Sequence, residues 1–272
     1  MAAQHVETEQ EQATLSTGLQ SATEEPEEEE EGAVMTLVEH LEELRRRIIR
    51  SFIAVVVASI AGFFLWDRVL NLLTNPLPDI AAKLPHTHGG QKLITTDIGE
   101  PFLIALKLAL AIGIVIASPY ILYQIGAFFT PALTRKERKY AIPFALLGIG
   151  LFVIGIVVGY FVLRYPVDWL INFGNSQFDM LIKADSYLTF VAYFLLAFGI
   201  TFELPLVLTF LGVVGIINSR MLRAKRMYIL FGLWILSCFI TPGADPYSPV
   251  IVGVALTLLF EFSIILLRII KR

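Results

Sequence analysis

Six long apolar runs, separated by polar segments, make up most of the chain. The runs are Ile48–Trp66, Phe102–Phe129, Ile142–Leu163, Tyr187–Leu211, Met227–Ile240 and Val250–Leu267. A helix rises about 1.5 Å per residue, so about 20 apolar residues cross a hydrocarbon core about 30 Å thick. The pattern therefore predicts an all-α, polytopic membrane protein with six transmembrane helices.

The last two runs are shorter than the others. Met227–Ile240 would be only about 21 Å long as a helix. Because the Pro- and Gly-containing turn Thr241–Pro249 joins it directly to Val250–Leu267, we expect both runs to cross a locally thinned bilayer. The alternative is a re-entrant pair that enters and leaves on the same side.

Proline and glycine mark irregular points within the predicted helices. Pro119 predicts a kink in the second run, because proline removes the hydrogen bond to the carbonyl of Val115. Pro205 weakens the fourth run in the same way. In the third run, Gly155-x-x-x-Gly159 permits close contact with another helix.

The connecting segments differ strongly in length. A short amphipathic helix over residues 40–47 is predicted before the first run, opened by a capping box that starts at Thr36. The turn Phe128–Tyr140 joins the second and third runs. Two long loops are predicted on the other side, Asp67–Gly99 and Arg164–Asp185, and we expect the first to form an ordered cap on the membrane surface.

Composition supports a membrane protein with one soluble tail. The chain is 56% hydrophobic, whereas soluble domains are nearer 45–50%. The formal net charge of −3 reflects the acidic run Glu24–Glu31. We expect residues 1–34 to be a disordered acidic cytoplasmic tail and residues 35–272 to be the membrane domain.

The basic residues predict the orientation of the six helices. Fifteen of the 21 Lys and Arg residues lie before or at the start of the first run, between the second and third, between the fourth and fifth, and in the C-terminal tail. Five lie in the other connections, and Lys107 lies within the second run. Because cytoplasmic segments are enriched in Lys and Arg, both termini are predicted to be cytoplasmic.

Glu203 is the costliest residue of the predicted spans, since a charge at mid-bilayer costs a few kcal/mol or more. It can be a docking point or a proton site within the membrane, or a structural acid bonded to a neighbouring helix. As a proton site it suggests an alternative function, a proton-coupled transporter of a small solute. Structural roles explain Lys107 and Glu261. Lys107 could pair with Glu100 or extend to the interface, and Glu261 could pair with Arg268.

Two acids lie among bases at the predicted cytoplasmic surface. Glu43 and Arg47 are spaced as i,i+4 helix partners, and Glu137 closes a capping box with Thr134. Alternatively, the two carboxylates form a site for a guanidinium ligand, which carboxylates bind in a bidentate manner.

The sequence offers no catalytic or cofactor-binding motif. We find no His-Glu-x-x-His, Gly-x-Ser-x-Gly or phosphate-binding Gly-rich motif, and no paired intramembrane aspartates, so no enzyme is predicted. His86 and His88 are only a weak suggestion of a metal site. No cofactor and no nucleic-acid partner are expected.

Several motifs together resemble one family, the TatC proteins, which are the multispanning receptor subunits of the twin-arginine translocase. The matching positions are His40-Leu41-x-Glu43-Leu44-Arg45-x-Arg47, Ser118-Pro119-x-Ile121-Leu122-Tyr123-Gln124, Pro131-Ala132-Leu133 through Glu137-Arg138, Phe198-Gly199-x-x-Phe202-Glu203-x-Pro205, and Thr241-Pro242 with Asp245. The resemblance covers about residues 35–270. It implies a cupped helical bundle whose concave face is open to lipid.

The resemblance also implies roles for individual residues. Glu43 and Glu137, with Arg45 and Arg138, match positions involved in binding twin-arginine signal peptides. Lys139 departs from the family pattern, since many relatives carry a second arginine there.

Further positions match the family at the partner-binding and outer faces. Glu203 and Pro205 match a groove thought to contact the single-helix partners TatA and TatB. Pro76 and Asp245 match outer-face positions of functional interest. The resemblance further implies a bacterial inner-membrane protein that contacts lipid and forms homo-oligomers within its complex.

Overall fold

The computed structural model describes residues 37–74, 93–129, 141–173, 181–243 and 245–269. The chain divides into two units, Met1–Glu42 and Glu43–Arg272. Of the first unit only residues 37–42 are described, and they are helical. All contacts discussed below lie within the second unit. The predicted acidic tail lies outside the described residues and stays a prediction.

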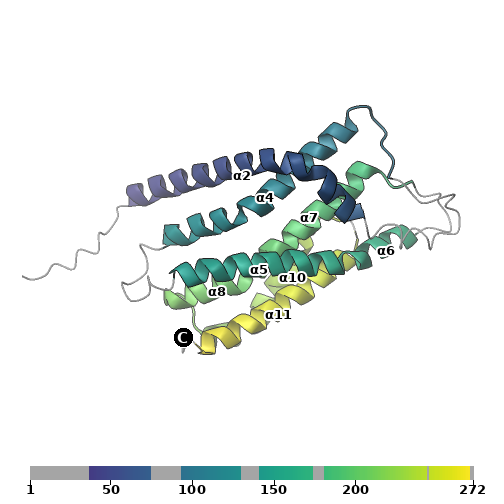
Figure 1. The fold of residues 1–272 in the computed structure, drawn as a ribbon. Coiled ribbons are helices and arrows are strands. Elements are labelled where there is room, and N and C mark those ends of the chain that lie inside the picture. Colours follow the sequence, from purple (N-terminus) through teal and green to yellow (C-terminus); the bar gives the residue numbers. More distant parts are fainter. Residues whose placement is uncertain (1–36, 75–92, 130–140, 174–180, 244, 270–272) are drawn as a thin grey trace, which may run out of the picture. The chain divides into compact units, whose positions relative to one another are not determined.

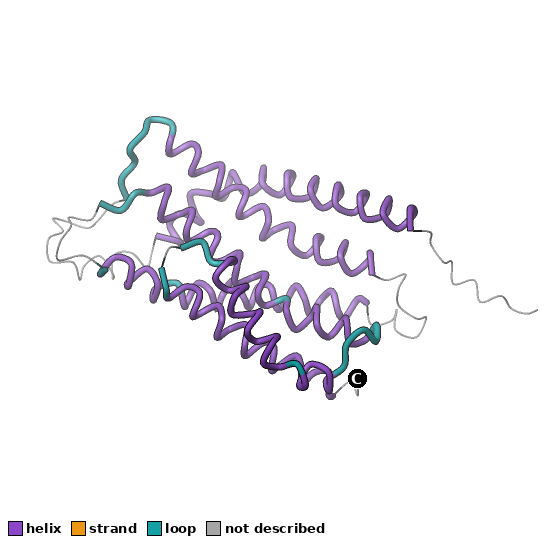
Figure 2. Tube along the Cα trace, turned by 180° about the vertical axis from the view of Figure 1, so that it is seen from behind, coloured by secondary structure: helices purple, strands orange, loops and turns teal. Residues whose placement is uncertain are grey.

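The described residues form helices and connecting loops (Figure 2). The only β-type pairing among them is an isolated parallel bridge between Ile94 and Lys183. The helices are α2 (Leu37–Thr74), α4 (Glu100–Phe129), α5 (Ala141–Val162), α6 (Arg164–Asn172), α7 (Ala184–Phe202), α8 (Leu204–Val213), α9 (Ser219–Ala224), α10 (Arg226–Ile240) and α11 (Tyr247–Ile269).

The predicted all-α membrane fold is confirmed. Five helical segments are long and apolar enough to cross a membrane, and α10 is a shorter apolar helix of 15 residues. Each of the six predicted apolar runs therefore corresponds to helix, and the fourth is divided between α7 and α8. The final helix α11 has 23 residues and extends its apolar run at both ends, so α10 alone is short.

The first predicted loop begins later than expected. Residues 67–74 continue α2 as helix, whereas residues 75–92 lie outside the described part. Val69 and Leu73 are spaced by four residues and belong to or contact the hydrophobic core. This spacing stabilises a helix although Asp67 and Arg68 interrupt the apolar run.

The second predicted loop also contains a helix. In α6, Val167 and Ile171 lie one turn apart and are both buried, which is the pattern of an amphipathic helix. The prediction of a loop over Arg164–Asp185 was therefore wrong for residues 164–172. Residues 174–180 lie outside the described part.

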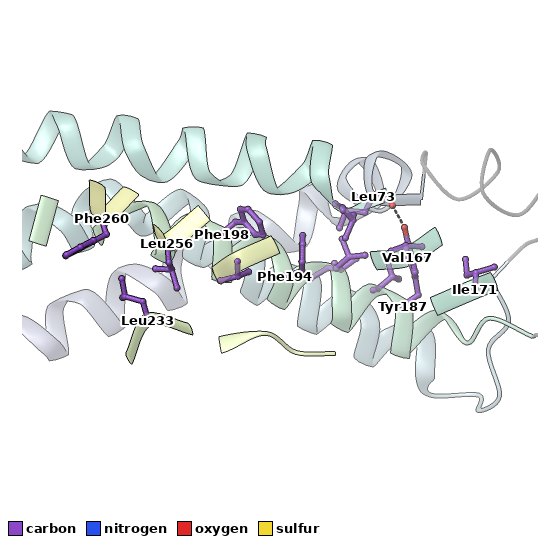
Figure 3. Close-up of a cluster of buried hydrophobic side chains, with 14 of the residues drawn as sticks. Leu73, Val167, Ile171, Tyr187, Phe194, Phe198, Leu233, Leu256 and Phe260 are labelled. Carbon is purple, nitrogen blue, oxygen red and sulfur yellow. Dashed lines mark hydrogen bonds between the residues drawn. The ribbon is translucent and has the colours of Figure 1, made fainter. Parts of the chain in front are cut away.

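Two tyrosines bind the last turn of α2. The Tyr160 hydroxyl donates to the carbonyl of Leu72 at 3.1 Å. The Tyr187 hydroxyl donates to the carbonyl of Leu73 at 2.9 Å, as Figure 3 shows. The last carbonyls of a helix have no partner within it. The hydroxyls supply such partners from α5 and α7.

The hydrophobic core is centred on α7. This helix lies along α5 and also packs against α4 and α11 (Figure 1). Phe194 and Phe198 of α7 and Phe260 of α11 are almost completely buried, in one continuous cluster (Figure 3). We call the end where α4 finishes and α5 begins the inner end, and the end where α7 begins the outer end.

Helix α4 continues through Pro119, and a side chain supplies the hydrogen bond that the proline nitrogen cannot donate. The helix runs through Pro119 without a break. The neighbouring Ser118 hydroxyl donates to the carbonyl of Val115 at 2.8 Å, which is the carbonyl that proline cannot serve. Side chains of this kind commonly satisfy such groups in membrane helices.

Candidate functional site

An acid, a base and an amide meet at the inner end. Arg47 donates to Glu43 Oε1 from Nε at 2.9 Å and from Nη2 at 2.5 Å. Its remaining nitrogen, Nη1, donates to Gln124 Oε1 at 3.1 Å. We call these three residues the inner-end cluster. The Glu43 and Arg47 side chains are 19% and 20% exposed, and Gln124 is buried.

The sequence accounts for this geometry. Glu43 and Arg47 are four residues apart in α2, so they lie on one face of the helix, as predicted. Gln124 lies five residues after Pro119 in α4 and is 77 residues from Arg47 in the sequence. The cluster therefore joins the start of α2 to the last turns of α4.

The inner-end cluster shows what the Glu43 carboxylate can bind. Its Oε1 accepts from two N–H donors of one guanidinium group, whereas the predicted bidentate mode places one N–H on each carboxylate oxygen. A guanidinium ligand for Glu43 therefore stays a prediction. Arg45 lies on a different face of α2 and is exposed. Glu137 and Arg138 lie outside the described residues, so their predicted roles remain predictions.

Glu203 lies where the fourth predicted span is interrupted. Helix α7 ends at Phe202 and α8 begins at Leu204, with the buried Pro205 in the first turn of α8. The predicted weakening at Pro205 is thus a break between two helices. Both Glu203 carboxylate oxygens are inaccessible to solvent and accept no hydrogen bond within the described part of the chain.

Gly148 of α5 makes room for the Glu203 carboxylate. A Cβ atom placed on Gly148 would lie 3.3 Å from Glu203 Oε2 and 2.9 Å from a methyl group of Leu206. The carboxyl group therefore points between helices at a position where the neighbouring helix has no side chain. One of the two interpretations of Glu203 was a structural acid bonded to a neighbouring helix. No hydrogen bond of this kind is present among the described residues.

Asp245 caps the last helix. Its carboxylate accepts hydrogen bonds from the Ser248 amide at 2.6 Å and from the Ser248 hydroxyl at 2.8 Å, and both residues are buried. This is N-capping, which satisfies donors at the start of α11. The predicted outer-face role of Asp245 thus has at least a structural component. Pro76 lies outside the described residues.

The other charges of the spans have partners that differ from the predicted ones. Lys107 pairs with Asp185 at 2.6 Å rather than with Glu100. Glu100 instead accepts from the Thr96 amide and lies 3.8 Å from Lys183.

Glu261 also has an unexpected partner. Its carboxylate lies 2.8 Å from Arg226 of α10 rather than pairing with Arg268. In both cases the partner belongs to another helix, and nothing in local spacing reveals it.

A small cavity of about 70 Å³ lies between α4 and α7 near the outer end. The Lys107–Asp185 pair lines it, and most of the remaining lining is apolar, including Leu108 and Leu188. Across the described ranges, no three His, Cys, Asp or Glu residues come together as metal ligands. His86 and His88 lie outside those ranges.

Gln124 is the site residue that sequence reasoning did not assign. It is a buried amide in an otherwise apolar stretch, Tyr120–Phe128, and that contrast was the available signal. A buried amide needs hydrogen-bond partners. Here Arg47 supplies one.

Comparison with known proteins identifies the family. Residues 39–254 match the family model described as Sec-independent protein translocase protein (TatC). The chain is 38% identical over 238 residues to TatC of Carboxydothermus hydrogenoformans, covering 87% of this chain and 94% of the relative. It is 32% identical over 234 residues to TatC of Escherichia coli (strain K12), covering 85% and 88%.

The fold agrees with a solved structure of the same family. A crystal structure described as the twin-arginine translocase receptor TatC superposes with a TM-score of 0.73 at 35% identity. It covers 86% of this chain and all of the solved one. The family match spans most of the chain, so this chain belongs to the TatC family of Sec-independent protein translocase proteins.

Proposed function

We propose that this chain is the receptor subunit of a twin-arginine translocase. Members of this family are multi-pass membrane components of a protein translocase and not enzymes. The proposed ligand is the paired-arginine motif of signal peptides on exported proteins. The proposed binding residues are Glu43 and Glu137, assisted by Arg45 and Arg138.

The inner-end cluster is the observation that carries this proposal. Glu43 Oε1 accepts from two N–H donors of the Arg47 guanidinium, which supports an arginine side chain as the ligand of this carboxylate. The predicted cytoplasmic location of this end would present the site to signal peptides before export. The proton motive force would drive transport, since no nucleotide-binding motif occurs in the sequence.

Partner recruitment forms the second part of the proposal. We place docking of the single-helix subunits TatA and TatB at Glu203 and Pro205, where α7 and α8 meet. A carboxyl group without a hydrogen-bond partner among the described residues supports this assignment, since a partner helix can supply the missing donor. The complex is proposed to contain several copies of this chain in a bacterial inner membrane.

Charge reversal at the proposed peptide site tests the receptor function. Glu137→Arg should lower the affinity for a twin-arginine peptide by about 10-fold or more, because a charge-assisted pair worth about 1.5–3 kcal/mol becomes a repulsion. Binding is measured with the full chain in lipid nanodiscs, using a labelled signal peptide and its Lys-Lys version. Crosslinking of the peptide to intact membranes provides a second measurement.

The matched control is Glu42→Gln, which removes an exposed acid next to Glu43. It should leave peptide binding unchanged, whereas Glu43→Gln should weaken it. Undiminished crosslinking to a correctly inserted Glu137→Arg chain would refute the receptor assignment. The alternative transporter function predicts the opposite pattern, with solute flux that depends on Glu203 and not on Glu43 or Glu137.

A further inference from the structure

Arg47 already occupies the carboxylate to which we assign ligand binding. Its Nε and Nη2 groups both donate to a single oxygen of Glu43, Oε1. A carboxylate oxygen has two lone pairs. Arg47 therefore uses the full acceptor capacity of that oxygen.

This occupancy limits how another ligand can bind. A bidentate guanidinium places one N–H on each carboxylate oxygen. To bind Glu43 in this manner, an incoming arginine must therefore displace at least one N–H of Arg47 from Oε1. Binding at Glu43 becomes an exchange of one guanidinium for another.

An ammonium group is a poor competitor in such an exchange. Arginine offers a planar fork of donors, whereas lysine is a compact, strongly hydrated point charge. An arginine that binds in the bidentate manner displaces as few as one of the two Arg47 hydrogen bonds, whereas a lysine that takes the place of Arg47 on Oε1 displaces both without matching their geometry. The resident arginine thus penalises lysine more than arginine.

Gln124 holds the displaced side chain. Its Oε1 accepts from Arg47 Nη1, the nitrogen that does not contact Glu43. Gln124 is buried on α4, so this contact can persist when Arg47 releases Glu43. Without it, the released guanidinium would lose its remaining protein partner within this cluster.

We propose that Arg47 is a specificity-determining residue: it is an internal guanidinium that the ligand must displace from Glu43, with Gln124 as its positioning residue. The inference rests on the proposed receptor function and adds the origin of the preference for arginine over lysine. It assigns to Arg47 a role in selectivity, not in affinity alone.

The test compares dissociation constants of twin-arginine and Lys-Lys peptides for the full chain in nanodiscs. Arg47→Met keeps an unbranched stem and removes the donors. It should strengthen binding of the twin-arginine peptide about 3- to 10-fold and that of the Lys-Lys peptide by more, since both escape competition. The ratio of the two constants should fall at least about 5-fold.

Further variants separate exchange from net charge and from misfolding. Arg47→Lys retains the charge and should also reduce the ratio, because it lacks the fork. Gln124→Glu leaves the donors of Arg47 in place and should draw Arg47 away from Glu43. It should therefore also reduce the ratio of the two dissociation constants. Arg50→Met removes an exposed positive charge from the same helix and should leave the ratio unchanged.

The outcomes distinguish the proposed role of Arg47 in selectivity from the proposed receptor function on which it rests. A wild-type chain that binds both peptides equally would refute the receptor function and the inference together. A wild-type preference for arginine that survives in folded Arg47→Met and Gln124→Glu would overturn the inference alone. Weaker twin-arginine binding by Arg47→Met would do the same, since it would make Arg47 a supporting contact rather than a competitor.

Discussion

Glu203 is a carboxylic acid without a hydrogen-bond partner among the described residues. Both of its oxygens are inaccessible to solvent, and neither accepts a hydrogen bond within the described residues. A buried polar group left unsatisfied costs about 1–3 kcal/mol. The absence of a side chain at Gly148 accommodates the carboxyl group without bonding it. Such a cost is expected at a site whose partner is another molecule.

Replacing this acid should therefore separate stability from assembly. Glu203→Met has a similar volume and should raise the free energy of unfolding by about 1–3 kcal/mol, because it removes the unsatisfied group. The same variant should retain less of the single-helix partner subunits on copurification. Thermal unfolding in detergent and quantification of copurified partners measure the two effects.

Glu261→Met is the matched control, since Glu261 is a membrane acid that has a partner. It pairs with Arg226 at 2.8 Å, and both side chains are partly exposed. An exposed ion pair contributes about 0–1 kcal/mol, so this variant should be neutral or slightly destabilising and should retain the partners. A loss of stability in Glu203→Met larger than in Glu261→Met would show that the Glu203 carboxyl is satisfied and structural.

The predictability of individual residues depends on whether their contacts are local. The Glu43–Arg47 pair was predicted from its i,i+4 spacing and is confirmed. The contact of Arg47 with Gln124 spans 77 residues, and that of Lys107 with Asp185 spans 78. Such pairs depend on which helices lie side by side, and a single sequence does not contain that information.

At the scale of elements, the packing of α5 on α7 depends on two glycines. A Cβ atom on Gly155 would lie 2.7 Å from the carbonyl oxygen of Phe198, and one on Gly159 would lie 2.9 Å from the Phe198 Cβ. The backbone atoms of a buried helix cannot move aside cheaply. The close approach predicted from Gly155-x-x-x-Gly159 is therefore confirmed, and its partner is α7.

A methyl group at Gly155 should separate these helices. Gly155→Ala should lower the free energy of unfolding by about 1–3 kcal/mol, the usual cost of overpacking a tightly packed contact. Gly150→Ala provides the control, since Gly150 is on the same helix and nothing lies within 4 Å of its Cβ position. That variant should be stabilising by about 0.5–1 kcal/mol through helix propensity. Equal effects in thermal unfolding would show that Gly155 has no special packing role.

The helices were predictable to the extent that apolar residues were continuous. All six apolar runs were found as helix, but the extension of α2 over residues 67–74 and the helix α6 were assigned to loops. Polar residues such as Asp67 and Arg164 interrupt the apolar pattern there. Amphipathic spacing of Leu73 in α2 and of Val167 in α6 stabilises these segments against the core, which is a tertiary effect.

At the scale of the whole molecule, residues 43–74 of α2 contact other helices of the second unit at their outer end, in the middle and at the inner end. Only 11% of its most apolar stretch is buried. Two tyrosine hydroxyls bind its last turn, Ser59 and Gly62 cross α4 closely in the middle, and Arg47 contacts Gln124 at the inner end. Most side chains of this apolar stretch are therefore not covered by the described part of the chain, and the contact of Arg47 with Gln124 is the one that the proposed ligand would change.

The orientation of the chain in the membrane is a prediction from charge that labelling can test. Ile98, before α4, is fully exposed, and Ile216, after α8, is 63% exposed. A single predicted span separates the loop at Ile98 from the turn Phe128–Tyr140. The loop at Ile216 is predicted on the same side as that turn, so Ile98 and Ile216 lie on opposite predicted sides of the membrane.

The native cysteine, Cys238, is exposed and is first replaced by serine. Ile98→Cys should then react with a membrane-impermeant maleimide in intact spheroplasts, whereas Ile216→Cys should react only after the membrane is permeabilised. The reverse pattern would place the inner-end cluster outside the cytoplasm, where a receptor for signal peptides awaiting export could not meet its ligand.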